Sequence, residues 1–297
     1  MVEEEKVKYS KKPLSIEDQI SLLESRGMIF DDREKAKEFL SSNNYYKFAG
    51  YWKKFAKPKT HQLSPTDNNN FDFFYDLYIN DKKLSQIILK YISLMEDNLR
   101  TQYAYNLSIN TKSSHPHIDD NNYYNLSKVY GSLEDAFSKS PHSFKEHYET
   151  TYEEPLPPIW VLVENLTLGT LVNTILQTKE EKISQLYKQF TYKKPLLRSF
   201  FHSLYFVRNQ CAHNSILWNI DYERLPEIPN KLDTGSLINL NHERPKIIIN
   251  FIIILHYLLE KINLGNEMKD EINSFFNSVS GRYLDGYGIK NNISPLI

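Results

Sequence analysis

A regular spacing of apolar residues between Leu84 and Tyr103 constrains the fold more than any other feature of the sequence. The apolar side chains recur every three or four residues, which places them on one face of an α-helix. Such a face must be buried against other elements of the protein. The pattern therefore predicts one long amphipathic helix, whose buried face comprises Leu84, Ile87, Ile88, Tyr91, Leu94, Met95, Leu99 and Tyr103.

The rest of the chain favours helices as well. Glycine is scarce, with 9 residues in 297. We find no internal repeat and no pair of alternating segments joined by a hairpin turn. The sequence therefore predicts an all-α fold class. Further helices are expected over residues 15–27, 31–52, 159–176, 195–213, 247–259 and 268–278.

A polar stretch that contains two prolines, "KPKTHQLSPTDNNN", interrupts the helical pattern after residue 56. Such composition is typical of a loop. We therefore expect an N-terminal helical element over residues 1–60 and a helical domain over residues 71–297, with C-terminal helices at its end.

Composition limits the expected cellular location and the kinds of partner. The net charge is −1, so any nucleic-acid partner must be met by a local patch of basic residues. The single cysteine, Cys211, excludes a disulfide framework. The N-terminus lacks the apolar centre of a signal peptide, and the longest apolar run, Ile247 to Leu259, is too short to cross a bilayer. We expect a cytoplasmic protein that uses no cofactor or metal and does not associate with a membrane.

An unusual polar motif, "RNQCAH", follows the apolar run of the helix predicted over residues 195–213. The imidazole of His213 can move a proton to or from a ribose 2′-hydroxyl near neutral pH. The guanidinium of Arg208 can hold a phosphate and stabilise its developing charge, and Asn209 can orient either group. These residues suit metal-independent cleavage of RNA.

Helical geometry places a condition on this site. Side chains five residues apart on a regular helix point away from each other. Arg208 and His213 can therefore meet only if the helix ends or deforms near Ala212, or if a second chain supplies one of them. A structural interpretation also fits, because basic residues late in a helix stabilise its C-terminal end.

The surroundings of the motif favour a phosphate ligand. Residues 182–220 contain no Asp or Glu. Concentrated positive charge is what phosphate binding requires, although a solvated basic face explains it equally well. The basic residues of this stretch include Lys193, Lys194 and Arg198, which we expect to contact RNA.

Four segments in order resemble the AbiD/AbiF abortive-infection family of bacterial phage-defence proteins, which belongs to the HEPN superfamily. The resemblance spans most of residues 12–219. The segments are the opening helices with "NYYKFAGYW", the helix "SLMEDNLRTQYAYNLS", the segment "PPIWVLVENLTLGTL" and the motif "VRNQCAHNSILWN".

The resemblance implies a HEPN-type helical bundle with an N-terminal helical extension. It also implies an endoribonuclease toxin of abortive infection, with Arg208, Asn209 and His213 at its catalytic site. Such enzymes commonly complete the site by forming a homodimer, and some are paired with a structured noncoding RNA antitoxin. Asn214 and Ile216 stand where the resemblance leads us to expect a His and an Arg.

Three further residues are candidates for supporting the site. Glu96 and Arg100 are four residues apart, so an ion pair within one helix is the simplest interpretation. The alternative is that one of them supports Arg208 from a neighbouring helix. Glu164 lies in an apolar run, where a buried carboxylate needs a partner such as Arg100 or Arg208.

A second basic stretch, residues 44–59, interleaves lysines with aromatic residues and contains no acid. The aromatic residues fit helix packing, but bases can also stack on such rings while lysines follow the phosphates. We expect this stretch to bind RNA, either substrate or antitoxin. The lysines concerned are Lys47, Lys53, Lys54 and Lys57.

Two alternatives to the endoribonuclease remain open. The chain could be a non-catalytic HEPN module that binds RNA or a protein through the same basic surface. It could also be the HEPN partner of a nucleotidyltransferase. The intact Arg208 and His213 favour the enzyme over the first alternative.

Overall fold

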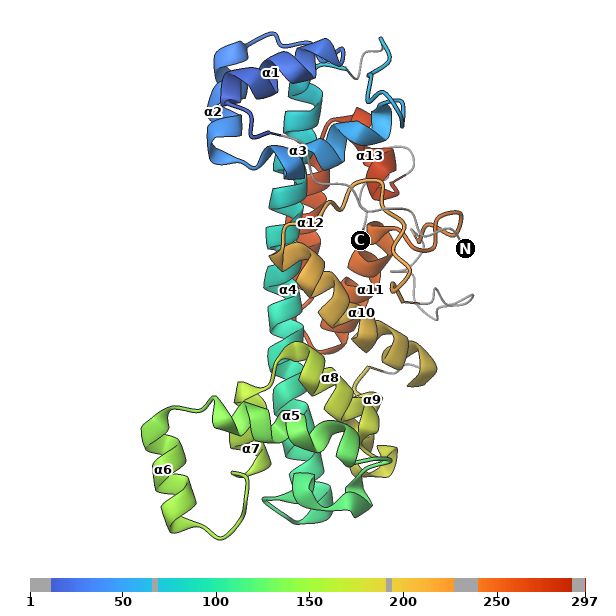
Figure 1. The fold of residues 1–297 in the computed structure, drawn as a ribbon. Coiled ribbons are helices and arrows are strands. Elements are labelled where there is room, and N and C mark those ends of the chain that lie inside the picture. The colour runs from blue at the N-terminus through green and yellow to red at the C-terminus, as the bar shows by residue number, and fades with distance from the viewer. Residues whose placement is uncertain (1–11, 66–68, 191–193, 227–239, 290–296) are drawn as a thin grey trace, which may run out of the picture. The chain divides into compact units, whose positions relative to one another are not determined.

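The computed structural model describes residues 12–65, 69–190, 194–226, 240–289 and 297 (Figure 1). Helices form most of this part of the chain. In order they are α1 (Ile16–Ser25), α2 (Arg33–Ser42), α3 (Tyr45–Trp52), α4 (Phe71–Thr111), α5 (Ser127–Ser138), α6 (His142–Thr151), α7 (Ile159–Leu162), α8 (Leu168–Gln177), α9 (Ser184–Lys188), α10 (Lys194–Ala212), α11 (Ile248–Lys261), α12 (Asn266–Ser278) and α13 (Gly281–Tyr287). Short 3₁₀ turns are η1 (Lys53–Phe55), η2 (Pro116–Ile118), η3 (Asp120–Asn122), η4 (Val163–Asn165) and η5 (Glu180–Lys182).

The predicted all-α class is confirmed. Within the described residues there is no strand, and extended pairing is limited to isolated bridges. The helix predicted around Leu84 and Tyr103 is α4, which runs for 41 residues. Both of those side chains are fully buried, as the spacing predicts.

The chain divides into two compact units, Met1–Asp81 and Lys82–Ile297. The domain limits expected from the sequence, 1–60 and 71–297, stay a prediction. In the first unit Ser15 caps α1 and Asp32 caps α2, each by accepting a bond from a backbone N–H. Aromatic rings form its core, where Phe39 packs edge-to-face against Phe48 and Tyr78 at 5.1 and 5.0 Å.

The single helix expected over residues 31–52 is wrong. The chain leaves helical geometry at Asn43, whose backbone is extended, and Asn44 then caps α3 by accepting a bond from the Tyr46 amide. The side-chain amide of Asn43 donates to the carbonyl of Phe39 at 2.9 Å. Asparagine side chains compete with the helix for backbone groups, so two in succession separate α2 from α3.

In the second unit, α11 is surrounded by protein. Its residues from Ile248 to Leu259 are all buried, which agrees with the apolar run. Asn250 is fully buried there, and it exchanges bonds of 2.7 and 3.0 Å with the backbone of Asn241. A satisfied amide of this kind can be buried at little cost. Figure 1 shows α12 alongside α4, where Lys90 pairs with Glu271 at 2.9 Å.

The continuous helix expected over residues 159–176 is also wrong. It is divided into α7, η4 and α8, with Leu166 in an extended conformation and Thr167 capping α8. The guanidinium of Arg100 donates to the carbonyls of Val163 and Leu166 at this break. These bonds replace those that an unbroken helix would make.

Four of the described helices lie where no helix was predicted, namely α5, α6, α9 and α13. Helix α8 packs against both α5 and α10, so α5 belongs to the core of the second unit. Among the described helices, none has the length and apolar character needed to cross a membrane.

Candidate functional site

Helix α10 presents two different faces. Its buried stripe holds Leu197, Phe200, Leu204, Val207 and Cys211. The opposite side of the helix and its C-terminal end expose polar side chains, several of which can contact an anion. The exposed polar residues are Arg198, His202, Arg208, Asn209 and His213. The motif residues therefore lie on the water-facing side of a helix that is anchored by its apolar stripe.

The helix ends immediately before His213. The amide of His213 still donates to Asn209 at 3.0 Å, so the helical register continues through this residue. The amides of Asn214 and Ser215 then donate to Cys211 and Gln210, at 2.9 and 2.8 Å. These two bonds form a Schellman motif, in which His213 is the C-cap residue.

Asn214 suits the backbone conformation at its position. Its φ is +47°, in the left-handed region. The position after the C-cap requires this conformation, which Asn adopts more readily than most residues do. The side chain at this position therefore helps to end α10.

Arg208 and Asn209 interact directly. The guanidinium of Arg208 donates to Oδ1 of Asn209 at 3.2 Å. Asn209 and His213 are four residues apart, so they share one face of the helix. Arg208 and His213 are about 140° apart around the axis, because each residue turns the helix by about 100°. The helix thus ends near Ala212, which is one of the conditions under which the two side chains could meet. However, its last turn keeps helical register, so the Arg208 side chain is not turned toward His213.

The field around this face is positive. The pKa of His202 is lowered by its partial burial and, in addition, by the nearby charges of Arg198 and Arg224. Like charges disfavour protonation of the imidazole. Of the other residues expected to bind RNA here, Lys194 begins α10, and Lys193 lies outside the described residues.

The segment that follows the motif is fixed by α13. The indole N–H of Trp218 donates to the carbonyl of Tyr283 at 2.8 Å, and the amide of Asn219 donates to that of Gly286 at 2.6 Å. A Cβ atom at Gly286 would lie 2.0 Å from Nε1 of Trp218. Only glycine fits against the indole ring there.

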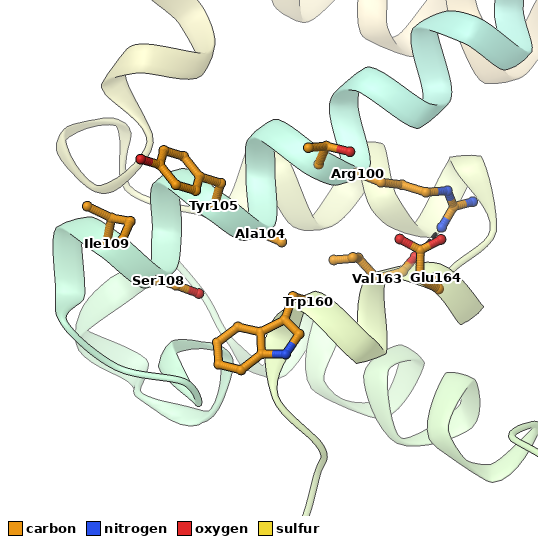
Figure 2. Close-up of a pocket in the computed structure, with 9 residues that line it drawn as sticks. Arg100, Ala104, Tyr105, Ser108, Ile109, Trp160, Val163 and Glu164 are labelled. Carbon is orange, nitrogen blue, oxygen red and sulfur yellow. Dashed lines mark hydrogen bonds between the residues drawn. The ribbon is translucent and has the colours of Figure 1, made fainter. Parts of the chain in front are cut away.

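The three supporting candidates gather at another place in the second unit. Arg100 pairs with Glu96, as their spacing predicts, and both are largely buried. Glu164 is exposed and lies near them at one end of a hollow (Figure 2). Within the described residues, no hydrogen bond or ion pair joins Glu164 to Arg100 or to Arg208. Arg100 instead stabilises the break between α7 and α8.

The lysine-rich stretch of the first unit combines buried and exposed aromatic residues. Phe48, Tyr51 and Trp52 are buried, so packing explains them. Tyr46 is 81% exposed, and the ammonium of Lys53 lies 5.6 Å from its ring centre. Lys47 is half-buried. Lys53, Lys54 and Lys57 are exposed.

Two histidines, His115 and His117, lie just after the end of α4. Burial and, secondarily, His115 lower the pKa of His117 to about 3, so its ring is neutral in the folded protein. His115 contacts Ser114 and Tyr148, at 3.0 and 3.2 Å. No cluster of three or more metal-capable side chains occurs in the described part of the chain.

A hollow between α4 and α7 was not predicted from the sequence. Trp160, Tyr105 and Ile109 line it and are exposed (Figure 2). The only signal in the sequence was an aromatic residue and an isoleucine four apart near the end of α4. Such a pair usually belongs to a buried face.

Comparison with known proteins identifies one family. The family model described as Abi-like protein matches residues 38–219. The match includes α10 and the motif, and it ends before α11, α12 and α13. No curated protein and no solved structure matches the chain.

Proposed function

Because the chain belongs to the family of Abi-like proteins, we propose that it is an abortive-infection protein of phage defence that acts as a metal-independent endoribonuclease toxin. Its catalytic residues are Arg208, Asn209 and His213. The observation that carries this proposal is their exposure together at the end of α10, in a stretch without Asp or Glu. Substrate phosphates meet no opposing charge from this stretch.

The chemistry follows from the side chains. His213 moves the proton while the 2′-oxygen forms its bond to phosphorus and the bond to the 5′-oxygen breaks. The 5′-oxygen leaves with a proton, and the other product ends in a 2′,3′-cyclic phosphate. Arg208 stabilises the charge on the phosphate oxygens, and Asn209 orients the guanidinium through their hydrogen bond.

The active unit is a homodimer. Arg208 and His213 of one chain point in different directions, since helical register continues to His213. Arg208 of one chain and His213 of its partner can flank the same phosphate if two copies of α10 face each other. Each dimer then has two composite sites.

A structured noncoding RNA restrains the toxin. We assign this role to the surface formed by Lys47, Lys53, Lys54, Lys57 and Tyr46. Exposed lysines supply charge for the phosphates, and the exposed ring of Tyr46 offers a stacking face.

One observation favours a second candidate. A single chain does not bring Arg208 and His213 together, so an isolated chain is suited to binding RNA without cleaving it. A non-catalytic binding module is therefore the alternative, and the same experiments separate the two functions.

Substitution of His213 tests the proposal directly. His213→Ala should fold normally and lose cleavage by about a hundredfold or more, because a proton carrier is missing. His142→Ala is the matched control, since it removes an exposed histidine that lies in α6, outside the motif. The measurement is cleavage of labelled RNA with EDTA present, together with toxicity in cells. Cleavage by His213→Ala at the rate of the unchanged protein contradicts the proposal, as does inhibition by EDTA.

Mixing two inactive variants tests the composite site. Arg208→Ala and His213→Ala, co-expressed, should recover about a quarter of the activity, because half of the random dimers contain one intact site. Absence of any recovery, with dimers shown by sedimentation, would place both residues of each site in one chain.

A further inference from the structure

A hollow of about 410 Å³ lies between the end of α4 and the α7–η4 segment (Figure 2). Its volume is in the range of pockets that bind small ligands or large side chains. In Figure 2, Tyr105 and Ile109 lie at one end, Arg100 and Glu164 at the other, and Trp160 along one side. The hollow is distinct from the motif on α10.

Large apolar side chains surround the hollow and remain in water. Tyr105 is 62% exposed, Ile109 58% and Trp160 51%. Scattered exposed apolar residues are ordinary, but three around one concavity mark an interaction site. Tryptophan and tyrosine are also the residues that most often dominate binding energy at interfaces.

A polar atom inside the hollow supports this interpretation. Oγ of Ser108 is buried and has no hydrogen-bond partner among the described residues. A buried hydroxyl without a partner is uncommon in folded proteins.

Charge distinguishes one end of the hollow from the other. The positive charge of Arg100 is balanced by Glu96, and its N–H groups also bond the carbonyls of Val163 and Leu166. Glu164 therefore adds a net negative charge to the rim. Within the described residues it makes no ion pair.

The chain leading to Trp160 is acidic as well. Residues 146–164 contain five Glu and neither Lys nor Arg. Glu146 and Glu149 have partners in α6, namely His142 and Lys145, both at 3.7 Å. Glu153 and Glu154 are exposed and form no ion pair in the described part of the chain. The segment that leads to Trp160 thus carries unbalanced negative charge.

We propose that this hollow docks a segment of a partner protein in which a large aliphatic or aromatic side chain is flanked by Lys or Arg. The apolar side chain packs against Trp160 and Ile109. The cation pairs with Glu164 and can lie against the indole face. RNA is disfavoured, because its phosphates would approach the carboxylate of Glu164. This role is independent of RNA cleavage.

Panning random short peptides, displayed on phage, against the full chain tests the proposal. Enriched peptides should combine Leu, Ile, Phe or Trp with Lys or Arg. Synthetic copies should lose at least about tenfold in affinity for Trp160→Ala, as measured by titration calorimetry. Tyr124→Ala is the matched control, because Tyr124 is 57% exposed and lies outside the hollow.

A charge exchange makes the test specific. Glu164→Lys should lose the basic peptide and bind a copy in which its Lys is replaced by Glu, since like charges at an interface oppose binding. Glu134→Lys, on the exposed side of α5, should keep the original preference.

Several results would overturn the proposal. One is panning that enriches no peptide, or only peptides whose binding ignores Trp160→Ala and Glu164→Lys. Another is quenching of the exposed Trp160 fluorescence by a short single-stranded RNA, because Trp52 and Trp218 are buried. A third is dissociation of a homodimer by Trp160→Ala in sedimentation, since the hollow would then be covered by a second copy.

Discussion

Residues 182–220 and residues 146–164 lie in the same compact unit but carry opposite charge. The first stretch contains no acid and the second contains neither Lys nor Arg. The first contains the His and the Arg that we propose to act on a phosphate, whereas the second contributes Trp160 and the carboxylate of Glu164 to the lining of an apolar hollow. The difference teaches that a net charge of −1 conceals two surfaces suited to different partners.

The largest expected effect concerns RNA affinity. Changing Lys47, Lys53, Lys54 and Lys57 together to Ala should weaken RNA binding by about a hundredfold at low salt, because fewer counterions are released. The slope of log affinity against log salt should become shallower by about 0.7 for each lysine that contacts a phosphate of single-stranded RNA. Fluorescence anisotropy at several salt concentrations measures both quantities.

Two glutamates of residues 146–164 supply the control for this experiment. Changing Glu153 and Glu154 to Gln should leave RNA affinity unchanged or slightly higher. Equal losses from the two sets of substitutions would remove the distinction between the regions. An unchanged salt slope in the lysine variant would mean that these lysines only solvate their helix.

The next effect tests whether the stretch of residues 182–220 depends on α13 for its stability. Gly286→Ala should lower the free energy of unfolding by about 2 kcal/mol, because its Cβ would overlap the Trp218 indole. Gly281→Ala is the control, since its Cβ would meet no atom within 4 Å. Denaturant unfolding measures the free energies. Equal stability of the two variants would show that the indole moves aside at little cost.

Acid should destabilise the protein through His117. Its pKa is about 3 when folded and 6.5 ordinarily, so between these values only the unfolded chain binds the proton. Stability from this residue is complete above pH 6.5 and declines as the pH falls toward 3. At pH 5.5 the loss is about 1.4 kcal/mol. His117→Leu should flatten this dependence in denaturant unfolding, whereas His142→Leu, at an exposed site, should keep it.

The smallest effect concerns Asn214. Asn214→Ala should cost about 1 kcal/mol, because Ala is strained at positive φ. Asn214→Gly should be close to neutral, since glycine adopts this conformation without strain. Thermal unfolding compares the two variants. Equal melting temperatures would mean that the end of α10 adjusts to either residue.

Local signals made most of the fold predictable. The caps Ser15 and Asp32 depend on local sequence alone, because each bonds a backbone amide within one turn of itself. The buried face of α4 was predictable because apolar residues recur along the sequence every three or four positions, which is the period of an α-helix. The break at Asn43 and Asn44 was not predicted, because apolar spacing continues across these residues. For an asparagine, the helical and the capping conformations are also close in energy.

Contacts between distant residues were not predictable. The break between α7 and α8 depends on Arg100, which precedes Val163 by 63 residues. Residues 105 and 109 lie beyond the predicted apolar face of α4, and their spacing of four does not distinguish a buried side of a helix from one left in water. For the motif, helical geometry predicts that Arg208 and His213 diverge, whereas the left-handed conformation of Asn214 required the backbone angle.

The attachment of Trp218 to α13 has a consequence for the timing of synthesis. The ribosome completes the motif, which ends at His213, about 70 residues before it adds Tyr283 and Gly286. At about 5–20 residues per second, this interval lasts roughly 4 to 14 s. During that time the nascent chain has the motif without its anchor, and a chain that terminates early never gains it. We therefore expect messages truncated before α13 to be harmless to the cell, although they encode every residue of the motif.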